Sequence, residues 1–446
     1  MLGPIRSLTA LAAATSVAFA APLAAIAAEP SLIRDAEIEH ISRALAAPIF
    51  AAAGLNPTTV EIHIVSDERV NAFVAHGQRV FLNTGLLLAV RDPLEIAGVI
   101  AHETGHIAGG HLARTQQALQ AATTQSILAF ILGAAAIAGG VGGDAGVGVL
   151  LGGRQAAEGS LLRYSRAQES SADQAALTLL NKAGYSSRGL ISFMELMAQQ
   201  EGLIEARQDP YLRSHPMFPE RISALRERAA AGAQEKPLSP EIADGFPRMQ
   251  AKIIGFTQPL GAVLRSYPVS DRSVPARYAR AIADHRLGRL DEAMTEMTAI
   301  LAINANDAYA LELRGQILLE SGRVADAIAD YTKATALAPK EPLIRVGLAS
   351  ALLATDDPKR APAAIEALKT ALDQERDNGD AWRQLALAFN RAGDDGQAAL
   401  ASAEQYLLGG APKEALRFAE QALRRLTQGS PGYLRAQDIK RAVESR

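Results

Sequence analysis

The sequence predicts a mainly α-helical chain with a small β component, in which one domain is followed by a solenoid of paired helices. Three observations predict this class. Apolar residues recur at helical spacing in most segments, and only two short stretches read as strands. A His-Glu-x-x-His motif lies in one of the helical segments. In the second half, the chain repeats itself at an offset of 34 residues, which is typical of stacked helical hairpins.

Residues 1–27 form a segment of their own. They carry one charged side chain, Arg6, within a run of Ala, Leu and Val, and they end in small residues up to Ala27. This pattern is typical of a secretory signal peptide cleaved near Ala27, and it predicts export to the periplasm. The alternative is a retained membrane anchor, but the run barely reaches the ~20 apolar residues of a spanning helix and Pro22 interrupts it.

The composition limits the classes of protein to which this chain can belong. A chain of 446 residues that is 48% hydrophobic can bury more than one core, so we expect at least two domains. A formal net charge of −3 gives no basis for nucleic-acid binding. Because the chain has no cysteine, a metal must be bound by histidines and carboxylates, and the absence of thiols fits an oxidising envelope compartment.

The first domain is expected to begin with a helix and two strands. Residues 31–53 have the apolar spacing of an amphipathic helix. Residues 60–65 alternate between apolar and polar and predict a half-buried strand, and residues 79–82 predict a second strand after a turn. An exposed edge strand can bind an extended substrate through main-chain hydrogen bonds, so this pair is a candidate substrate platform.

The motif that begins at His102 carries the strongest chemical signal. Pro93 is a good first helical residue and Gly109 a good stop, so the motif is expected on a helix. His102 and His106 are four residues apart and share one helix face, where both imidazoles can reach a single ion. Glu103 stands beside them, where a general base for metal-assisted hydrolysis is needed.

The third ligand is expected from a later helix. Glu169 and Asp173 share one face of that helix, and small neighbours allow it to approach another helix closely. We predict that Glu169 binds the metal and that Asp173 accepts the free ring N–H of a ligating histidine; the alternative is a solvated acidic face. His111 is nearer in sequence, but on a continuing helix it lies about 180° from His102 and faces away from the metal.

Taken together, these motifs resemble the HtpX/BepA-like zinc metallopeptidase family, which also includes the CAAX prenyl proteases. The resemblance covers about residues 35–230. It extends to Asn71-Ala72-Phe73, Asn83-Thr84-Gly85-Leu86-Leu87, Ser214-His215-Pro216 and Glu220-Arg221-Ile222. It implies a helical zincin-type fold with a small β-ribbon over the active site, one Zn2+ per chain, and endopeptidase activity on envelope proteins. The export signal and the repeats make the chain most similar to the BepA-like branch. For this branch the resemblance implies misassembled outer-membrane proteins as clients and the outer-membrane β-barrel assembly machinery as partner.

The resemblance also implies roles for His215 and Arg221. In the BepA-like branch, the resemblance implies that the histidine matching His215 caps the open metal position and keeps the enzyme latent. In the prenyl-protease branch the residues matching His215 and Arg221 lie in the cleft and stabilise the tetrahedral intermediate. A neutral imidazole can ligate and a protonated one can donate to an oxyanion, so both roles stay open. The alternatives are a helix-entry residue near a surface turn for His215 and a structural ion pair for Arg221.

An apolar and glycine-rich segment covers residues 126–153. Its purely apolar part is too short to span ~30 Å of hydrocarbon at 1.5 Å per residue. We interpret the segment as a mobile flap or helical hairpin beside the cleft that contacts unfolded substrate or a membrane surface, with membrane embedding as the alternative.

The remaining chain is expected to divide into three parts: residues 28–230 form the metallopeptidase domain, residues 231–274 a linker and connecting helix, and residues 275–440 the repeat domain. The offset of 34 residues is the tetratricopeptide period, which predicts a curved solenoid with a groove for polypeptides. Four aromatic residues of the repeat domain are candidate groove anchors, but at helical spacing such residues more often belong to the core, and we assign none of them to the groove: Trp382, Tyr278, Tyr309 and Tyr331.

The sequence therefore predicts a periplasmic zinc endopeptidase whose repeat domain docks clients or the assembly machinery. In this hypothesis His102, His106 and Glu169 hold the metal and Glu103 moves the proton. The alternative is a chaperone or adaptor scaffold with a latent metal site.

Overall fold

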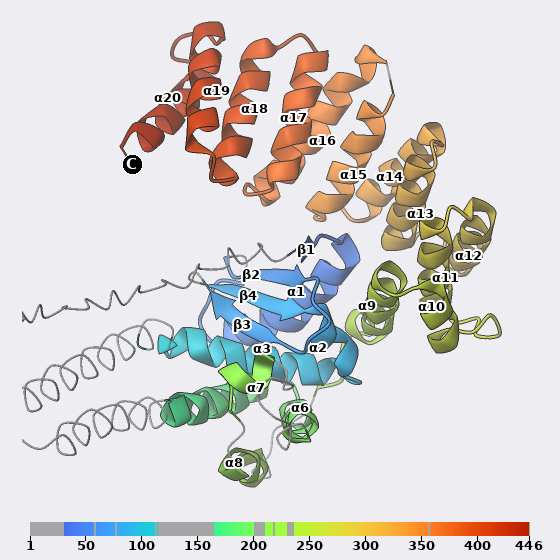
Figure 1. Ribbon diagram of the computed structural model, residues 1–446, viewed down its shortest axis with the longest axis vertical. Helices are drawn as coiled ribbons and strands as arrows, with labels where there is room; N and C mark the ends of the chain where they lie inside the picture. The colour runs from blue at the N-terminus through green and yellow to red at the C-terminus, as the bar shows by residue number, and fades with distance from the viewer. Residues whose placement is uncertain are drawn as a thin grey trace, which may run out of the picture.

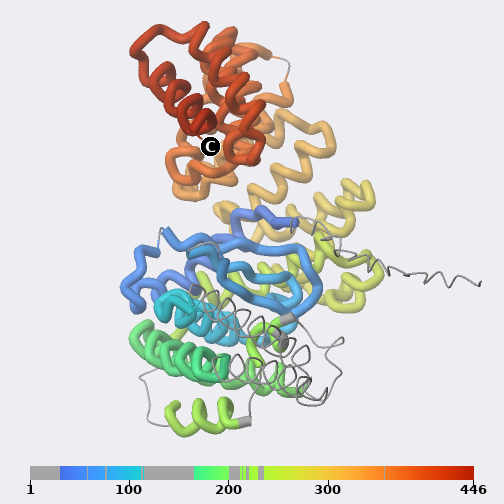
Figure 2. The backbone as a smooth tube through the Cα atoms, turned by 60° about the vertical axis from the view of Figure 1, so that its left-hand side comes forward, coloured from blue at the N-terminus to red at the C-terminus, as the bar shows by residue number. Residues whose placement is uncertain are grey.

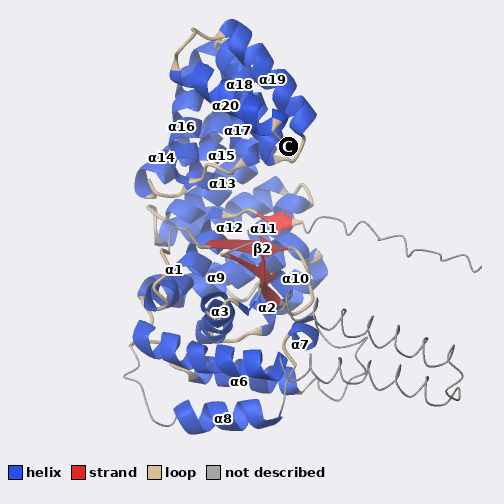
Figure 3. Ribbon diagram, turned by 90° about the vertical axis from the view of Figure 1, so that its left-hand side faces the viewer, coloured by secondary structure: helices blue, strands red, loops and turns tan. Residues whose placement is uncertain are grey.

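The computed structural model is mainly helical with one small sheet, as the sequence predicts (Figure 1; Figure 3). The residues that it describes are 31–57, 59–75, 78–111, 114, 165–199, 210–216, 219–229, 236–355 and 357–445. The predicted signal peptide, the apolar segment 126–153 and part of the linker lie outside these residues. No helix within the described ranges combines the length and apolar character needed to cross a membrane.

Helix α1 (Ala36–Ala52) opens the sheet-bearing part of the chain. The Asp35 side chain caps it by accepting hydrogen bonds from the backbone N–H groups of Glu37 and Ile38. Its apolar side chains, among them Leu45, are buried in the same core as the sheet. Burial of this apolar stripe holds α1 in place.

The sheet has four strands rather than the expected two. They are β1 (Leu32–Ile33), β2 (Glu61–Val65), β3 (Ala72–Ala75) and β4 (Arg79–Asn83). The spatial order is β1-β2-β4-β3, with β2 and β4 parallel and β3 antiparallel to β4. The two predicted strands are present, but β1 and β3 are too short for a period of two to be visible in the sequence.

The helices that follow begin against the sheet, where the first two contact strands, and continue to the connecting region. They are α2 (Thr84–Ala89), α3 (Pro93–Ala108), a helix through residues 165–183, α6 (Arg188–Ala198), α7 (Pro210–Ser214), α8 (Pro219–Ala229), α9 (Pro240–Thr257) and α10 (Leu260–Ser266). Helix α3 packs against α1, α6 and β3. It therefore lies at the centre of this part of the molecule (Figure 1).

The repeats form a solenoid of ten helices within the described chain, which confirms the predicted architecture. They are α11 (Val274–Arg286), α12 (Leu290–Ile303), α13 (Ala308–Glu320), α14 (Val324–Leu337), α15 (Pro342–Leu353), α16 (Ala361–Gln374), α17 (Gly379–Arg391), α18 (Asp395–Leu408), α19 (Pro412–Arg425) and α20 (Pro431–Glu444). Consecutive helices pack as antiparallel neighbours, and the stack curves back over the sheet (Figure 1; Figure 2). Tyr278 and Tyr331 are buried in its core, as interpreted from the sequence.

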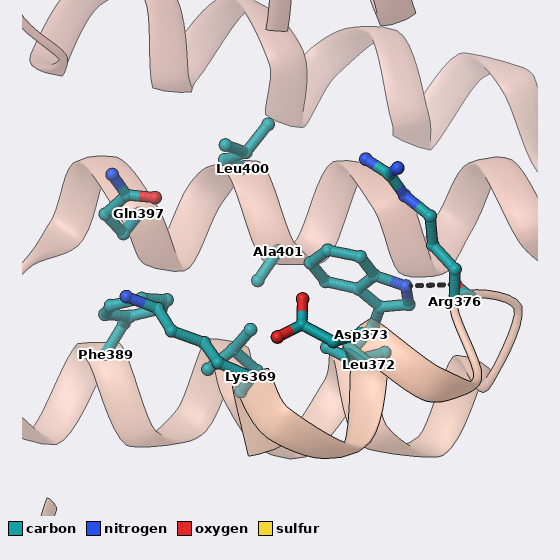
Figure 4. Close-up of a pocket in the computed structure, with 10 residues that line it drawn as sticks. Lys369, Leu372, Asp373, Arg376, Phe389, Gln397, Leu400 and Ala401 are labelled. Carbon is teal, nitrogen blue, oxygen red and sulfur yellow. Dashed lines mark hydrogen bonds between the residues drawn. The ribbon is translucent and has the colours of Figure 1, made fainter. Parts of the chain in front are cut away.

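Trp382 does not belong entirely to the core. It is half-buried and lines a cavity of about 410 Å³. The cavity lies between α16, α17 and α18 (Figure 4). The floor is apolar and includes Leu385 and Phe389. Lys369, Asp373 and Arg376 stand at the exposed rim. The cavity arises where one hydrophobic cluster of the solenoid ends and the next begins.

Buried charges join the solenoid to the sheet-bearing part. Lys252 of α9 is fully buried, and its Nζ lies 2.8 Å from Asp35 and 3.4 Å from Glu37 at the start of α1. The same ammonium lies 3.7 Å from Glu312 of α13, and Arg248 of α9 contacts Glu37 at 2.6 Å. Burial raises the pKa of Glu312 to about 7, although Lys252 opposes the rise. Because unpaired buried charges are costly, these contacts fix α1 against the first repeats.

His40 extends this junction to the next repeat. Its Nδ1 lies 2.6 Å from Glu341 at the start of α15, and its Nε2 contacts Glu241 of α9. Arg43 reaches Glu341 as well, at 3.0 Å. The hydrogen bond with Glu341 raises the pKa of His40, with Glu241 adding to the rise and partial burial opposing it.

We predict that the junction weakens with rising pH. A histidine whose pKa is higher in the folded state contributes stability that is complete below its unfolded pKa of ~6.5 and is lost as the pH rises through the raised folded value. The denaturant midpoint should therefore fall more steeply between neutral and alkaline pH in the wild type than in His40→Gln. Equal slopes in the two proteins would contradict this assignment.

Candidate metal centre

Helix α3 presents the His-Glu-x-x-His motif inside the protein. Asp92 caps the helix by accepting a hydrogen bond from Leu94 N at 2.8 Å, and Pro93 occupies its first turn. The helix ends at Ala108, before Gly109. His102 is 0% exposed and Glu103 is 1% exposed, so both functional side chains point into the protein rather than to solvent.

Four side chains from three separate segments meet at one point. The Nε2 atoms of His102 and His106 are 3.1 Å apart. Glu169 places Oε2 3.4 Å from His102 Nε2 and Oε1 3.4 Å from His106 Nε2. His215, which follows α7, places Nδ1 3.4 Å from His102 Nε2 and 3.3 Å from both Glu169 oxygens. All four ligand-type atoms lie within 4.8 Å of one another.

This donor set fits a divalent metal ion. Three imidazole nitrogens and a carboxylate are ligands that zinc accepts. A tetrahedral ion with bonds of ~2.0–2.1 Å separates its ligand atoms by roughly 3.3–3.4 Å. The distances among His102, His106 and Glu169 and from His102 to His215 run from 3.1 to 3.4 Å, and all four ligand-type atoms lie within 4.8 Å of one another. Three imidazoles and a carboxylate converge on one buried point, which is the arrangement that a bound cation requires.

Asp173 and Arg221 support the group from behind. Nδ1 of His102 lies 3.0 Å from Asp173 Oδ1, and Arg221 donates to both Asp173 oxygens at 2.8 Å. Arg221 also donates to the Pro216 carbonyl oxygen at 2.8 Å and lies 3.0 Å from Glu169. Burial alone would raise the pKa of Asp173, but the hydrogen bonds from Arg221 and His102 outweigh it and lower this pKa. Arg221 therefore links Asp173, Glu169 and the loop that carries His215.

Glu103 faces the same cluster from the other side. Its Oε1 lies 3.3 Å from Nε2 of His215. Burial raises the pKa of Glu103 above its ordinary value, although His215 and His102 oppose the rise. A carboxylate with a raised pKa is suited to accept and return a proton near neutral pH.

His215 is held by Tyr211. Its backbone N–H donates to the Tyr211 carbonyl oxygen at 2.8 Å, and the two rings pack with centroids 4.6 Å apart. His215 therefore stands between Glu103 and the other possible ligands. Sequence spacing alone could not show this position, because the histidine lies 113 residues after His102.

Gly105 permits the close approach of the two ligand-bearing helices. A Cβ atom at this position would lie 2.9 Å from the Ala172 carbonyl oxygen and 3.1 Å from Ala175 Cβ. The small face expected around Glu169 thus packs directly against α3. Larger side chains here would separate Glu169 from the histidine pair.

His111 lies elsewhere than expected. The helix does not continue through it: α3 ends at Ala108, and Gly110 adopts a positive φ of 61°. The imidazole of His111 turns back, and its Nδ1 lies 2.9 Å from Nδ1 of His106. His111 is therefore not one of the four ligand-type residues, but it contacts one of them on the opposite side of the ring.

The substrate platform also needs correction. The two predicted strands, β2 and β4, each have neighbours on both sides and cannot accept another strand. The edge strand next to α3 is β3, which contacts this helix. Its Phe73 stacks on Phe81 of β4, with centroids 4.9 Å apart. The sequence pattern missed β3 because only four residues form it.

Comparisons with known proteins agree with this arrangement. Residues 33–229 match the sequence profile of Peptidase family M48, and residues 278–342 and 312–366 match that of the Tetratricopeptide repeat. The Beta-barrel assembly-enhancing protease of Yersinia pestis is 26% identical over 414 residues, which is 90% of this chain and 82% of that protein. The protein of the same name from Escherichia coli (strain K12) is 24% identical over 409 residues, 90% of this chain and 81% of its own. The Metalloprotease YcaL of the same strain is 33% identical over 179 residues, covering 40% of this chain and 64% of that protein.

Proposed function

Since this chain belongs to peptidase family M48 and continues into tetratricopeptide repeats, it is a metalloendopeptidase, and we propose that it is a periplasmic zinc enzyme that hydrolyses misassembled or damaged outer-membrane proteins. The observation that carries this proposal is the convergence of two histidines and Glu169 beside the buried Glu103. The name of the two long relatives supports β-barrel assembly as the process. The signal-peptide pattern of residues 1–27, with cleavage near Ala27, supports the compartment.

In this proposal His102, His106 and Glu169 hold the metal, and Asp173 orients His102. A bound zinc ion would polarise the scissile carbonyl and lower the pKa of a water molecule to ~7. Glu103 accepts the proton of the attacking water and returns it to the leaving amine. The raised pKa of Glu103 suits both transfers, because a carboxylate that binds a proton too weakly cannot hold it between the two steps.

We assign substrate binding to the open edge of β3. An extended client segment would add to this edge through main-chain hydrogen bonds, which give affinity with little dependence on side chains. This mode suits an enzyme whose clients are damaged proteins of many sequences. The contact between β3 and α3 would bring the scissile peptide near Glu103.

Replacement of the proposed base tests the catalytic assignment. We expect Glu103→Gln to lower casein hydrolysis by about 10²- to 10⁴-fold, because the amide cannot accept a proton. Its metal content should equal that of the wild type, whereas Glu169→Ala should lose metal. Elemental analysis and proteolysis of the same preparations measure both quantities. Proteolysis by Glu103→Gln at the wild-type rate, with contaminants excluded, would remove Glu103 from the mechanism.

Replacement of His215 tests whether the metal site is held in a latent state. Its position among the ligand-type atoms supports the latch that the family resemblance implies, in which the imidazole occupies the position that substrate needs. We expect His215→Ala to keep its metal and to hydrolyse casein several-fold faster than the wild type. A lower rate would instead support stabilisation of the tetrahedral intermediate by His215, and an unchanged rate would argue against either role.

We assign docking of clients, or of the barrel-assembly machinery, to the solenoid. The cavity beside Trp382 has room for a large apolar side chain, and its floor is apolar (Figure 4). Lys369, Asp373 and Arg376 at the rim together carry a charge of +1, which favours a client segment with an acidic residue beside the apolar one.

Because Trp382 is the single tryptophan of the chain, its fluorescence can report binding at this cavity. A tryptophan-free, urea-unfolded outer-membrane protein should shift the fluorescence of Trp382 on binding, and Trp382→Ala should weaken binding by about tenfold or more. Leu387→Ala on the same helix is the matched control, because Leu387 is exposed and does not line the cavity. Equal affinity of the two variants would place docking elsewhere.

The second candidate is a chaperone or adaptor scaffold in which the solenoid does the work and His215 keeps the metal centre closed. Complementation of an envelope-assembly defect by Glu103→Gln would favour this scaffold. Failure to complement, with normal levels of the variant, would favour the protease.

A further inference from the structure

His111 contacts the metal centre from behind. Its side chain is 5% exposed, and its Nδ1 lies 2.9 Å from Nδ1 of His106. The Nε2 atom of His106 points the other way, toward His102 and Glu169. The two ring nitrogens of His106 therefore have different partners.

The contact between His106 and His111 requires one ring to donate a hydrogen bond and the other to accept it. If Nε2 of His106 is to bind a cation, its lone pair must be free and the ring proton must be on Nδ1. A buried N–H needs an acceptor, and the unprotonated Nδ1 of His111 is placed to be that acceptor. His102 has the equivalent contact with Asp173, at 3.0 Å. Each histidine of the motif thus has its own partner, a carboxylate for one and a neutral imidazole for the other.

Gly109 provides the space for the His111 ring. A Cβ atom on this residue would lie 2.4 Å from Nε2 of His111 and 2.8 Å from its Cδ2. The backbone itself does not require glycine here, because Gly109 has an ordinary right-handed helical conformation with φ −73°. The requirement is steric: any side chain at position 109 would displace the imidazole from His106.

The backbone of His111 is tied to the second ligand-bearing helix. Gln168, the residue before Glu169, donates from Nε2 to the His111 carbonyl oxygen at 3.2 Å. The turn after α3 is therefore anchored on the helix that supplies Glu169. This anchor keeps the His111 ring from moving away with the end of α3.

From these contacts we propose that His111 is a positioning residue that fixes the tautomer and orientation of His106 for metal binding. In this proposal position 109 must be glycine, because a side chain there would occupy the space of the His111 ring. The inference rests on the proposed metal centre and adds to it a residue outside the ligand set. Partners of this kind typically contribute 10- to 100-fold to metal affinity.

The test measures the affinity of the purified full-length chain for Zn2+ alone, by competition with a chromophoric chelator. We expect His111→Ala to bind Zn2+ about 10- to 100-fold more weakly than the wild type. His111→Asn should restore most of the affinity, because its Oδ1 is an acceptor at the same number of bonds from the backbone as Nδ1. A role in packing alone would not be rescued by this smaller polar side chain.

Gly109→Ala is the sharper variant, since it leaves every polar group in place. It should weaken Zn2+ binding as much as His111→Ala does, because the added Cβ would displace the His111 ring from His106. Gly261→Ala in α10 is the matched control, where the nearest atom to the added Cβ is Arg265 Nη1 at 3.8 Å. Its Zn2+ affinity should not change.

Wild-type affinity in both His111→Ala and Gly109→Ala would overturn the inference while leaving the metal centre intact. If His111→Ala fails to fold, wild-type affinity in Gly109→Ala still overturns it, and weakened affinity in Gly109→Ala supports it. Failure of the wild type to bind Zn2+ would instead refute the proposed function, so the two failures are distinguishable.

Discussion

At Gly105, helix α3 and the helix over residues 165–183 come so close that one added methyl group would lie 2.9 Å from a backbone oxygen. This approach brings Glu169 to the histidine pair. Helices normally pack with their axes 8–10 Å apart, and the lower part of that range requires small residues on both surfaces. Gly105 on one helix and alanines on the other satisfy this condition. The metal centre therefore depends first on the absence of side chains and only then on the presence of ligands.

The charged side chains near this helix contact form a series of consecutive ion pairs and hydrogen bonds. Arg221 holds Asp173, Asp173 lies against Nδ1 of His102, and His102 faces the common ligand position. An isolated buried carboxylate would be costly, and the guanidinium offsets that cost while leaving Asp173 able to accept from the imidazole. His106 has no carboxylate partner of this kind within the described contacts and is in contact with the imidazole of His111 instead. The two histidines therefore have unequal surroundings, although the motif presents them as equivalent.

The solenoid is joined to the same frame through α1. The helix start at Asp35, the buried Lys252 and the acidic residues of the first repeats form one buried group of charges. Burial of these charged groups costs desolvation free energy. The junction fixes the orientation of the solenoid against α1 only when each buried charge is paired with an opposite one. In consequence, a client held by the repeats would have a fixed relation to the edge of β3.

The sequence by itself determined the features that depend on local spacing. Two histidines four residues apart must share a helix face, Asp92-Pro93 begins that helix, and an offset of 34 residues produces stacked helix pairs. It also indicated the pairing of Glu169 and Asp173, which again is a helical spacing. Only the tertiary structure decided that β3 is the sheet edge beside α3, that His215 stands between Glu103 and the ligand group, and that His111 turns back onto His106. These features depend on contacts between segments distant in sequence, or on a turn that ends a helix, and periodicity within one segment contains no information about either.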